Sequence, residues 1–168
     1  MEMKCGLYRV GIITASDKGS IGERADASGE RIKAIVSEHG YEVAYYRILP
    51  DDMELLQEAM KELCDENRVD LILTTGGTGF SRRDVTPEAT TAVAERMVPG
   101  IPEAMRAYSM TITKRAMLSR GVAGIRKRTL IVNLPGSPKA VEESLTYIIG
   151  ELKHGLEILK GDAGECAR

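Results

Sequence analysis

The segment from Leu71 to Ala89 constrains the fold of this chain more than any other stretch. An apolar run, Leu71-Ile72-Leu73, is typical of a buried strand, and it leads into a turn with glycines at positions 76, 77 and 79. Thr86-Pro87-Glu88-Ala89 then has the composition of a helix start. Where a strand is followed by a glycine-rich turn and then a helix, backbone N–H groups and the positive end of the helix dipole point toward the same place. The segment therefore predicts an anion site, most simply for phosphate.

Strands and helices alternate through the first half of the chain. The hydrophobic pattern predicts strands over residues 8–14, 41–49 and 69–74, and helices over residues 28–39 and 53–66. This order with short connections is typical of an α/β fold, in which helices cover both faces of a mostly parallel sheet. Ligands of such sheets bind beyond the carboxyl ends of the strands. We therefore expect the Ser16-Asp17 loop, the Pro50-Asp51-Asp52 turn and the Gly76–Asp84 loop to converge.

The second half of the chain contains a reversed strand in this interpretation. Helices are predicted over residues 87–97, 102–109, 113–118, 139–149 and 151–159, and strands over residues 121–125 and 129–134. The two strands are joined only by Arg126-Lys127-Arg128, and so short a joint favours an antiparallel hairpin. No linker, repeat or low-complexity tract interrupts the pattern, so we expect residues 1–168 to form a single domain.

The composition excludes several classes of protein. A net charge of −2 and a scarcity of aromatic residues argue against nucleic-acid binding. Three widely spaced cysteines and two histidines offer neither a disulfide framework nor a zinc site. No apolar run has membrane-spanning length, and no signal peptide is recognisable before the first strand. We therefore expect a cytoplasmic protein that has no membrane partner.

The glycine turn fits neither of the common nucleotide-binding motifs. A P-loop would require Gly-Lys-Ser/Thr, which does not follow here, and a dinucleotide fingerprint would require glycine where Arg82 stands. The alternative for the turn is a tight connection without a ligand. Phosphate binding remains the prediction, but a generic nucleotide-binding domain is disfavoured.

Acidic residues stand beside two of the predicted loops. Asp51 and Asp52 precede a helix and Asp84 precedes another, so each is a candidate helix cap as well as a candidate ligand. Arg82 and Arg83 beside Asp84 are equally compatible with a solvated surface. Two carboxylates at neighbouring strand ends would, however, supply what a magnesium–nucleotide site needs.

A second strand–turn–helix junction follows at residues 133–140, Asn-Leu-Pro-Gly-Ser-Pro-Lys-Ala. Asn133 is a polar residue at the end of an apolar strand, where an amide can meet backbone or ligand. Lys139 stands at a helix start, where its charge opposes the dipole, so an anionic partner is one interpretation and a surface lysine the other.

These motifs together resemble the molybdopterin adenylyltransferase family of molybdenum cofactor biosynthesis, the MogA/MoaB-type proteins. The resemblance covers roughly residues 8–159. The segments that carry it are Thr74–Gly79, Arg83–Ala89 and Asn133–Ala140, together with Thr14–Asp17 and Leu118–Arg120.

The resemblance implies a three-layer α/β/α fold and a homotrimer. It also implies that the terminal phosphate of molybdopterin attacks the α-phosphate of ATP, assisted by Mg²⁺, to give adenylylated molybdopterin and pyrophosphate. A protein that inserts molybdenum is the implied recipient of the product. The alternative is a non-catalytic molybdopterin-binding or carrier paralogue.

The resemblance assigns the critical acidic roles to Asp51 and Asp84, which would position Mg²⁺ and the reacting phosphates. The predicted substrate and phosphate contacts are Ser16, Asp17, Thr75, Gly76, Gly77, Thr78, Gly79, Ser81, Arg82, Thr86, Asn133, Pro135, Gly136, Ser137 and Lys139.

Overall fold

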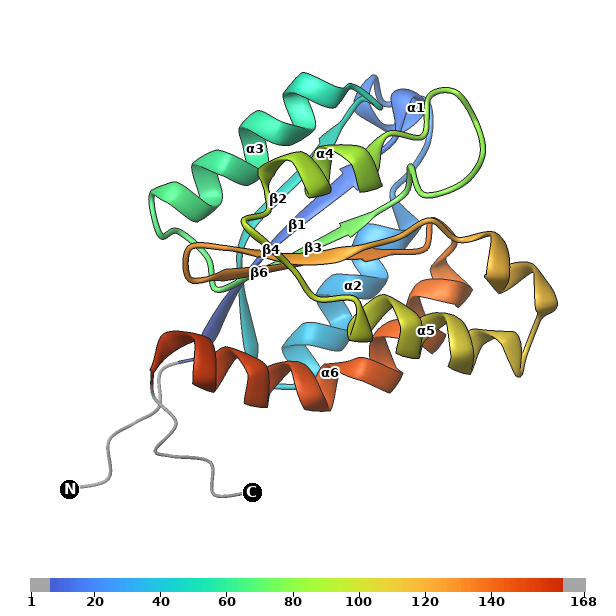
Figure 1. Cartoon of the computed structure of the whole chain (residues 1–168). Helices are drawn as coiled ribbons and strands as arrows, with labels where there is room; N and C mark the ends of the chain where they lie inside the picture. The colour runs from blue at the N-terminus through green and yellow to red at the C-terminus, as the bar shows by residue number, and fades with distance from the viewer. Residues whose placement is uncertain (1–6, 162–168) are drawn as a thin grey trace.

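A single sheet with strand order β2-β1-β3-β6-β5-β4 organises the computed structural model, which describes residues 7–161 (Figure 1). The strands are β1 Tyr8–Ala15, β2 Tyr41–Leu49, β3 Leu71–Thr75, β4 Arg96–Met97, β5 Ala123–Arg126 and β6 Thr129–Leu134. Strands β2, β1, β3 and β6 are mutually parallel, whereas β5 pairs antiparallel with both of its neighbours. The predicted single reversed strand is therefore confirmed.

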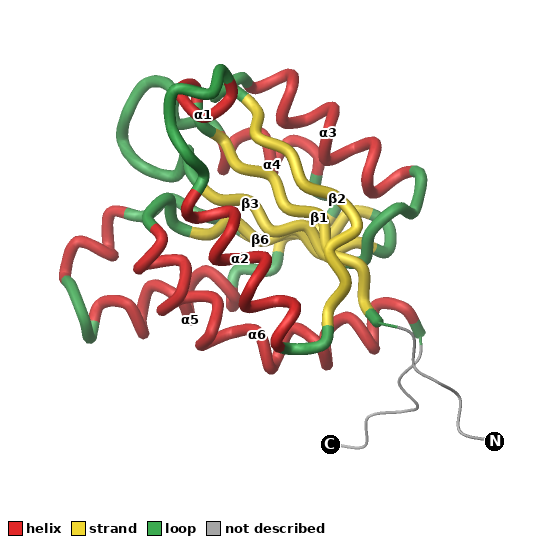
Figure 2. The backbone as a smooth tube through the Cα atoms, turned by 180° about the vertical axis from the view of Figure 1, so that it is seen from behind, coloured by secondary structure: helices red, strands yellow, loops and turns green. Residues whose placement is uncertain are grey.

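Helices cover both faces of this sheet (Figures 1 and 2). They are α1 Asp17–Ser20, α2 Ala27–Glu38, α3 Met53–Asp65, α4 Thr86–Val93, α5 Gly100–Met110 and α6 Pro138–Lys160, with a 3-10 helix, η1, at Lys114–Leu118. Helices α2, α5 and α6 pack on one face, and α3 and α4 pack on the other. This arrangement confirms the predicted three-layer α/β/α fold. None of these helices, within residues 7–161, has the length and apolar character needed to cross a bilayer.

The central strands are apolar throughout because both of their faces are buried. Successive side chains of a strand point to opposite faces. Leu71 and Leu73 of β3 join the core under α2, α5 and α6, whereas Ile72 joins the core under α3 and α4. All three are completely buried. A continuous apolar run is the expected signature of a parallel strand in this position.

The helix predicted over residues 87–97 was too long. Helix α4 ends at Val93, and Ala94 adopts an extended backbone. Glu95 N–H then donates to the Ile125 carbonyl and Val98 N–H to the Ala123 carbonyl, so the segment adds β4 to the sheet. Pairing with the free edge of β5 outweighs the local helix preference of this segment.

The two helices predicted over residues 139–149 and 151–159 are a single helix, α6. Gly150 does not interrupt it, although glycine inside a helix costs about 1 kcal/mol. Ile149 and Leu152 on either side are buried against the sheet, and this packing outweighs the cost.

Asn133 connects three elements inside the protein. Its side-chain NH₂ donates to Thr74 Oγ1 and Thr90 Oγ1, each at 2.9 Å, and its Oδ1 accepts from Val122 N–H at 3.1 Å. The residue is 1% exposed. Its amide therefore holds β3, α4 and the segment before β5 around the end of β6.

We expect Asn133→Ala to lower the free energy of unfolding by about 2–4 kcal/mol, because it leaves buried polar groups without partners. Urea unfolding measures this, with the exposed Glu58→Ala on α3 as the control. An unchanged urea midpoint for Asn133→Ala would show that the network does not stabilise the fold.

Candidate functional site

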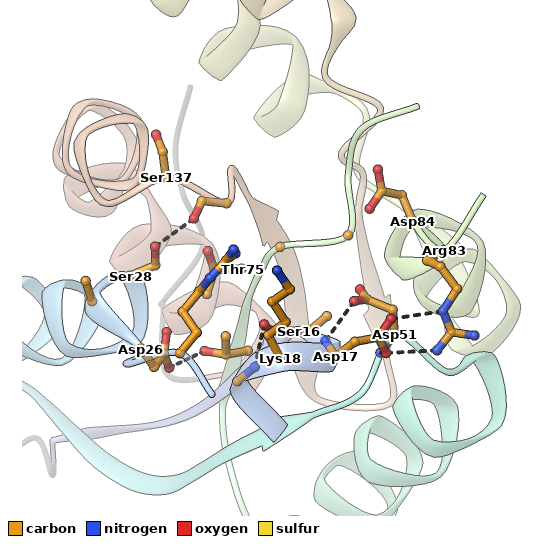
Figure 3. Close-up of a pocket in the computed structure, with 18 of the residues that line it drawn as sticks. Ser16, Asp17, Lys18, Asp26, Ser28, Asp51, Thr75, Arg83, Asp84 and Ser137 are labelled. Carbon is orange, nitrogen blue, oxygen red and sulfur yellow. Dashed lines mark hydrogen bonds and ion pairs between the residues drawn. The ribbon is translucent and has the colours of Figure 1, made fainter. Parts of the chain in front are cut away.

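A cavity of about 730 Å³ lies beyond the carboxyl ends of β1, β2, β3 and β6 (Figure 3). The Ser16-Asp17 loop, the Asp51 turn and the glycine loop after β3 all contribute to its wall, and so does the turn before α6. The predicted convergence of the three loops is thus confirmed. The parallel direction of the four strands is what brings these loops to one edge.

Asp17 and Asp51 hold two of the loops together by a reciprocal pair of hydrogen bonds. Asp17 N–H donates to Asp51 Oδ2 at 3.1 Å, and Asp51 N–H donates to Asp17 Oδ1 at 2.9 Å. Asp52 has the other role considered for this acidic pair, because it caps α3 by accepting from Leu55 N–H. The two neighbouring carboxylates therefore have different roles. Asp52 caps the N-terminus of α3, and Asp51 faces the cavity.

The charge of Asp51 is only partly compensated by its surroundings. Burial raises the pKa of its carboxyl group, and the nearby charges of Asp17 and Asp84 raise it further. Within residues 7–161, the buried Asp51 Oδ1 and Thr86 Oγ1 atoms have no hydrogen-bond partner. A Cβ added to Gly77 would lie 2.3 Å from Thr86 Oγ1 and 3.1 Å from Asp51 Oδ1, so both atoms adjoin this glycine. A buried carboxylate oxygen in this state favours a proton or a cation as its partner.

The turn after β3 requires glycine for two reasons. Gly76 and Gly77 have φ angles of 87° and 67°, in the left-handed region that other residues rarely adopt. A Cβ at Gly76 would also lie 2.3 Å from the Ala15 carbonyl oxygen. The glycines therefore allow the β3 loop to pass directly against the end of β1.

Arg83, not Arg82, is the arginine of this loop that reaches the cavity. Arg83 Nε donates to Asp17 Oδ2 at 3.0 Å, and its Nη2 donates to Asp17 Oδ1 at 2.8 Å. This hydrogen-bonded guanidinium lowers the pKa of Asp17. The sequence placed two arginines side by side, and no pattern in it distinguishes which of the two turns inward.

Asp84 is not a helix cap, which was the alternative considered for it. Val85 occupies the cap position of α4 and makes no side-chain cap. Asp84 Oδ2 instead accepts from Ser81 N–H at 2.9 Å. Its carboxylate is therefore held by its own loop at the edge of the cavity.

Arg120 fixes the loop that carries Asp84. Its Nε donates to the Gly79 carbonyl at 2.6 Å, its Nη2 donates to the Asp84 carbonyl at 2.8 Å, and its Nη1 pairs with Glu88. One guanidinium thus binds both ends of residues 79–84.

The other end of the cavity is formed by the start of α2. Asp26 caps this helix and also accepts from Thr14 Oγ1 at 2.6 Å and from Tyr46 OH at 2.5 Å. Ser28 Oγ donates to the Gly136 carbonyl at 2.7 Å. These contacts join the loop after β1 to the turn before α6.

The predicted site residues fall into two groups. Those that line the cavity are Ser16, Asp17, Asp51, Thr75, Gly76, Gly77, Ser81, Asp84, Gly136 and Ser137. Those that do not are Thr78, Gly79, Arg82, Thr86, Asn133, Pro135 and Lys139. Thr86 and Asn133 are buried, whereas the Lys139 side chain is 85% exposed.

Six polar lining residues were not predicted: Thr14, Lys18, Arg24, Asp26, Ser28 and Arg83. Asp26 stands three residues before Gly29, whose N–H it accepts, and this capping position was the only signal available for it. Lys18 lies in the short helix α1 and Arg24 in the segment after it, and the sequence alone does not show which side chains of this polar stretch face inward.

We expect Arg120→Ala to release residues 79–84, so that trypsin cleaves the native protein after the exposed Arg82 or Arg83 several-fold faster. Mass spectrometry of timed digests identifies the cut. Arg126→Ala is the control, because it also removes one arginine, but one that pairs with Asp65 on α3. Equal cleavage of the two variants at these sites would show that Arg120 does not restrain the loop.

Comparison with known proteins finds relatives that match most of this chain. Residues 11–154 match a family described as "Probable molybdopterin binding domain". The molybdopterin adenylyltransferase of Helicobacter pylori is 40% identical over 155 residues, which cover 91% of this chain and 88% of that protein. The enzyme of the same name from Escherichia coli is 42% identical over 142 residues, covering 82% of this chain and 71% of that protein.

A solved structure has the same fold. The molybdopterin biosynthesis enzyme MoaB of Thermus thermophilus superposes with a TM-score of 0.87 at 46% identity, covering 92% of this chain and 98% of that one. The chain therefore belongs to the molybdopterin-binding domain family that includes the molybdopterin adenylyltransferases.

Proposed function

We propose that this protein transfers an adenylyl group from ATP to the terminal phosphate of molybdopterin. A phosphate oxygen of molybdopterin attacks the α-phosphorus of ATP, the bond from that phosphorus to the bridging oxygen breaks, and pyrophosphate leaves with the electron pair. The observation that supports this best is the half-buried carboxylate of Asp51, whose buried Oδ1 atom has no hydrogen-bond partner among residues 7–161, in one cavity with Asp84, in a chain whose relatives are named for this reaction.

The donor set of the cavity fits Mg²⁺. This ion is usually held by one or two carboxylates together with substrate phosphates. Asp51 and Asp84 would hold it, and the Asp51 Oδ1 atom is available as a ligand. Within residues 7–161 no group of three His, Cys, Asp or Glu side chains forms a metal cage, so phosphates would complete the coordination. Bound Mg²⁺ would neutralise charge on the phosphates.

The remaining residues of the cavity position and neutralise the substrates in this proposal. The Gly76-Gly77 turn brings backbone close to the phosphates without side chains, and Lys18, Arg24 and Arg83 supply positive charge. Adenylyl transfer needs little covalent chemistry from the protein, because it depends mainly on positioning and charge neutralisation. Arg83 would exchange its bond to Asp17 for a bond to phosphate when the nucleotide binds.

We also propose a homotrimer in the cytoplasm that passes its product to a protein that inserts molybdenum. These points rest on the family resemblance. A non-catalytic molybdopterin carrier is the second candidate, and the presence of both Asp51 and Asp84 favours the enzyme over it.

We expect Asp84→Asn to lower kcat by at least about 100-fold while the protein stays folded, because the change removes one charge from the site and preserves its shape. The assay incubates the purified protein with molybdopterin, ATP and Mg²⁺ and follows adenylylated pterin by chromatography. Asp52→Asn is the control, since Asp52 caps α3 and Asn is an equally good cap. Wild-type turnover in Asp84→Asn would remove Asp84 from the mechanism. Tight binding of molybdopterin without product in the unmodified protein would favour the carrier.

We expect Asp51→Asn to abolish turnover and yet to raise Tm by about 2 °C at pH 7 without ligands. The pKa of Asp51 is raised in the folded protein, so its carboxyl group favours folding when protonated and opposes folding once pH exceeds the folded pKa. Removing the charge therefore stabilises the neutral-pH fold. Calorimetry at pH 4 and pH 7 measures this, and the gain is smaller at pH 4. A lower Tm at pH 7 would contradict this electrostatic account of Asp51.

A further inference from the structure

Exposed apolar side chains are concentrated in two short segments of the chain. Within residues 7–161 eleven large apolar side chains are exposed, and five of them belong to the loop after β3 and to the segment from the end of α5 through η1. We call these five the apolar patch: Phe80, Met110, Ile112, Met117 and Leu118. All are at least 41% exposed. Single exposed apolar residues are normal, but four within nine positions are typical of an interaction site.

The two segments are joined by Arg120. Its N–H donates to the Thr78 carbonyl at 3.0 Å, and its Nε donates to the Gly79 carbonyl at 2.6 Å. Phe80 follows Gly79, and Leu118 stands two residues before Arg120, so both flank this contact. Two opposite views of the backbone show the loop after β3 and η1 on the same side of the molecule (Figures 1 and 2). The apolar patch therefore belongs to one side of the protein.

The surroundings of the apolar patch are basic. The whole chain has 23 basic and 25 acidic residues, but residues 104–141 contain eight lysines and arginines and neither aspartate nor glutamate. Lys114 and Arg115 of η1 are exposed, as is Arg82 in the loop after β3. None of these three takes part in an ion pair within residues 7–161. Their charges are complementary to carboxylates of a partner.

The loop that carries Phe80 also forms part of the wall of the larger cavity. Ser81, Arg83 and Asp84 line that cavity, whereas Phe80 and Arg82 do not and are exposed instead. Arg82 was predicted as a phosphate contact, and its place in the loop gives it a position beside Phe80. A macromolecule bound to the apolar patch would therefore contact the loop that holds Asp84.

Another protein fits this surface better than a nucleic acid, a membrane or a symmetric second copy. Methionine, arginine and aromatic residues are enriched at protein interfaces. Phe80 is the only aromatic residue of the apolar patch, which is too little for base stacking. The five residues of η1 present a small apolar face compared with an interfacial membrane helix. Two copies that met through the same basic surface would repel each other.

We propose that the apolar patch, together with Arg82, Lys114 and Arg115, is the docking surface for the protein that takes up the adenylylated product. That partner would present carboxylates around apolar side chains. This inference rests on the proposed function for the role of the partner. A protein docked here lies beside the cavity, so the product passes between the two proteins without diffusing through the solvent.

Binding of the purified molybdenum-inserting protein of the same organism tests this surface. We expect Lys114→Glu and Met117→Ser each to weaken this binding by about tenfold or more, because the first change sets like charges against each other and the second removes an apolar contact. Both residues are exposed and line no wall of the larger cavity, so adenylyl transfer without the partner stays at the wild-type rate. Biolayer interferometry measures Kd.

Two matched controls change the surface elsewhere. Lys61→Glu reverses the charge of an exposed lysine on α3, which takes part in no ion pair within residues 7–161. Ile158→Ser removes an apolar side chain that is 53% exposed, close to the 59% of Met117, near the C-terminal end of α6. Both controls are expected to bind the partner like the wild type.

The outcomes separate this inference from the proposed function. Unchanged affinity in both patch variants, or no binding by the wild type, would overturn the docking surface even if the protein makes adenylylated molybdopterin. A smaller oligomer in either patch variant, measured by light scattering, would assign the surface to a second copy and overturn it as well. Binding of the wild type to phosphatidylglycerol vesicles that both variants lose would assign it to a membrane instead. Weaker docking of both variants of a protein that never forms the product would support the surface and refute the transferase.

Discussion

The parallel packing of β1, β3 and β6, buried on both faces, is the constraint on which the rest of the structure depends. Because these strands run in one direction, the loops after them must emerge at one edge of the sheet. The carboxyl ends of β1 and β3 are so close that Gly76 passes directly against the Ala15 carbonyl. The position of the site is therefore a consequence of the core, and α1 and the start of α2 complete its wall.

The acidic residues at this edge differ in how far the fold compensates their charges. Asp17 is compensated by Arg83, and Asp52 by the start of α3, whereas half-buried Asp51 has one buried oxygen that lacks a partner among the described residues. A fold selected for stability alone would not keep such a carboxylate, because its burial disfavours the charged form. Its retention is understandable if a cation and phosphates complete its surroundings during function.

Contacts from distant parts of the chain give the glycine loop a defined shape. Arg120 binds both ends of residues 79–84, and Asn133 ties the strand before the loop to the helix after it. Both residues belong to the second half of the chain, in segments that the family motifs include. Their positions show that a motif can stabilise a site from outside the cavity, since neither side chain is needed as a ligand for this role.

The sequence by itself determined the alternation of the long strands and helices in the first half, the single reversed strand and the edge at which the loops meet. These features follow from local hydrophobic pattern, turn residues and connection length, which act over neighbouring positions. It also predicted that Asp51, Asp84 and the glycine turn lie at this edge, where they line the cavity. The tertiary structure alone decided that residues 96 and 97 extend the sheet, that α6 continues through Gly150, and that Arg83 rather than Arg82 faces the cavity. Each of these depends on a partner far away in the sequence, because strand edges, core packing and ion pairs exist only after the chain has folded.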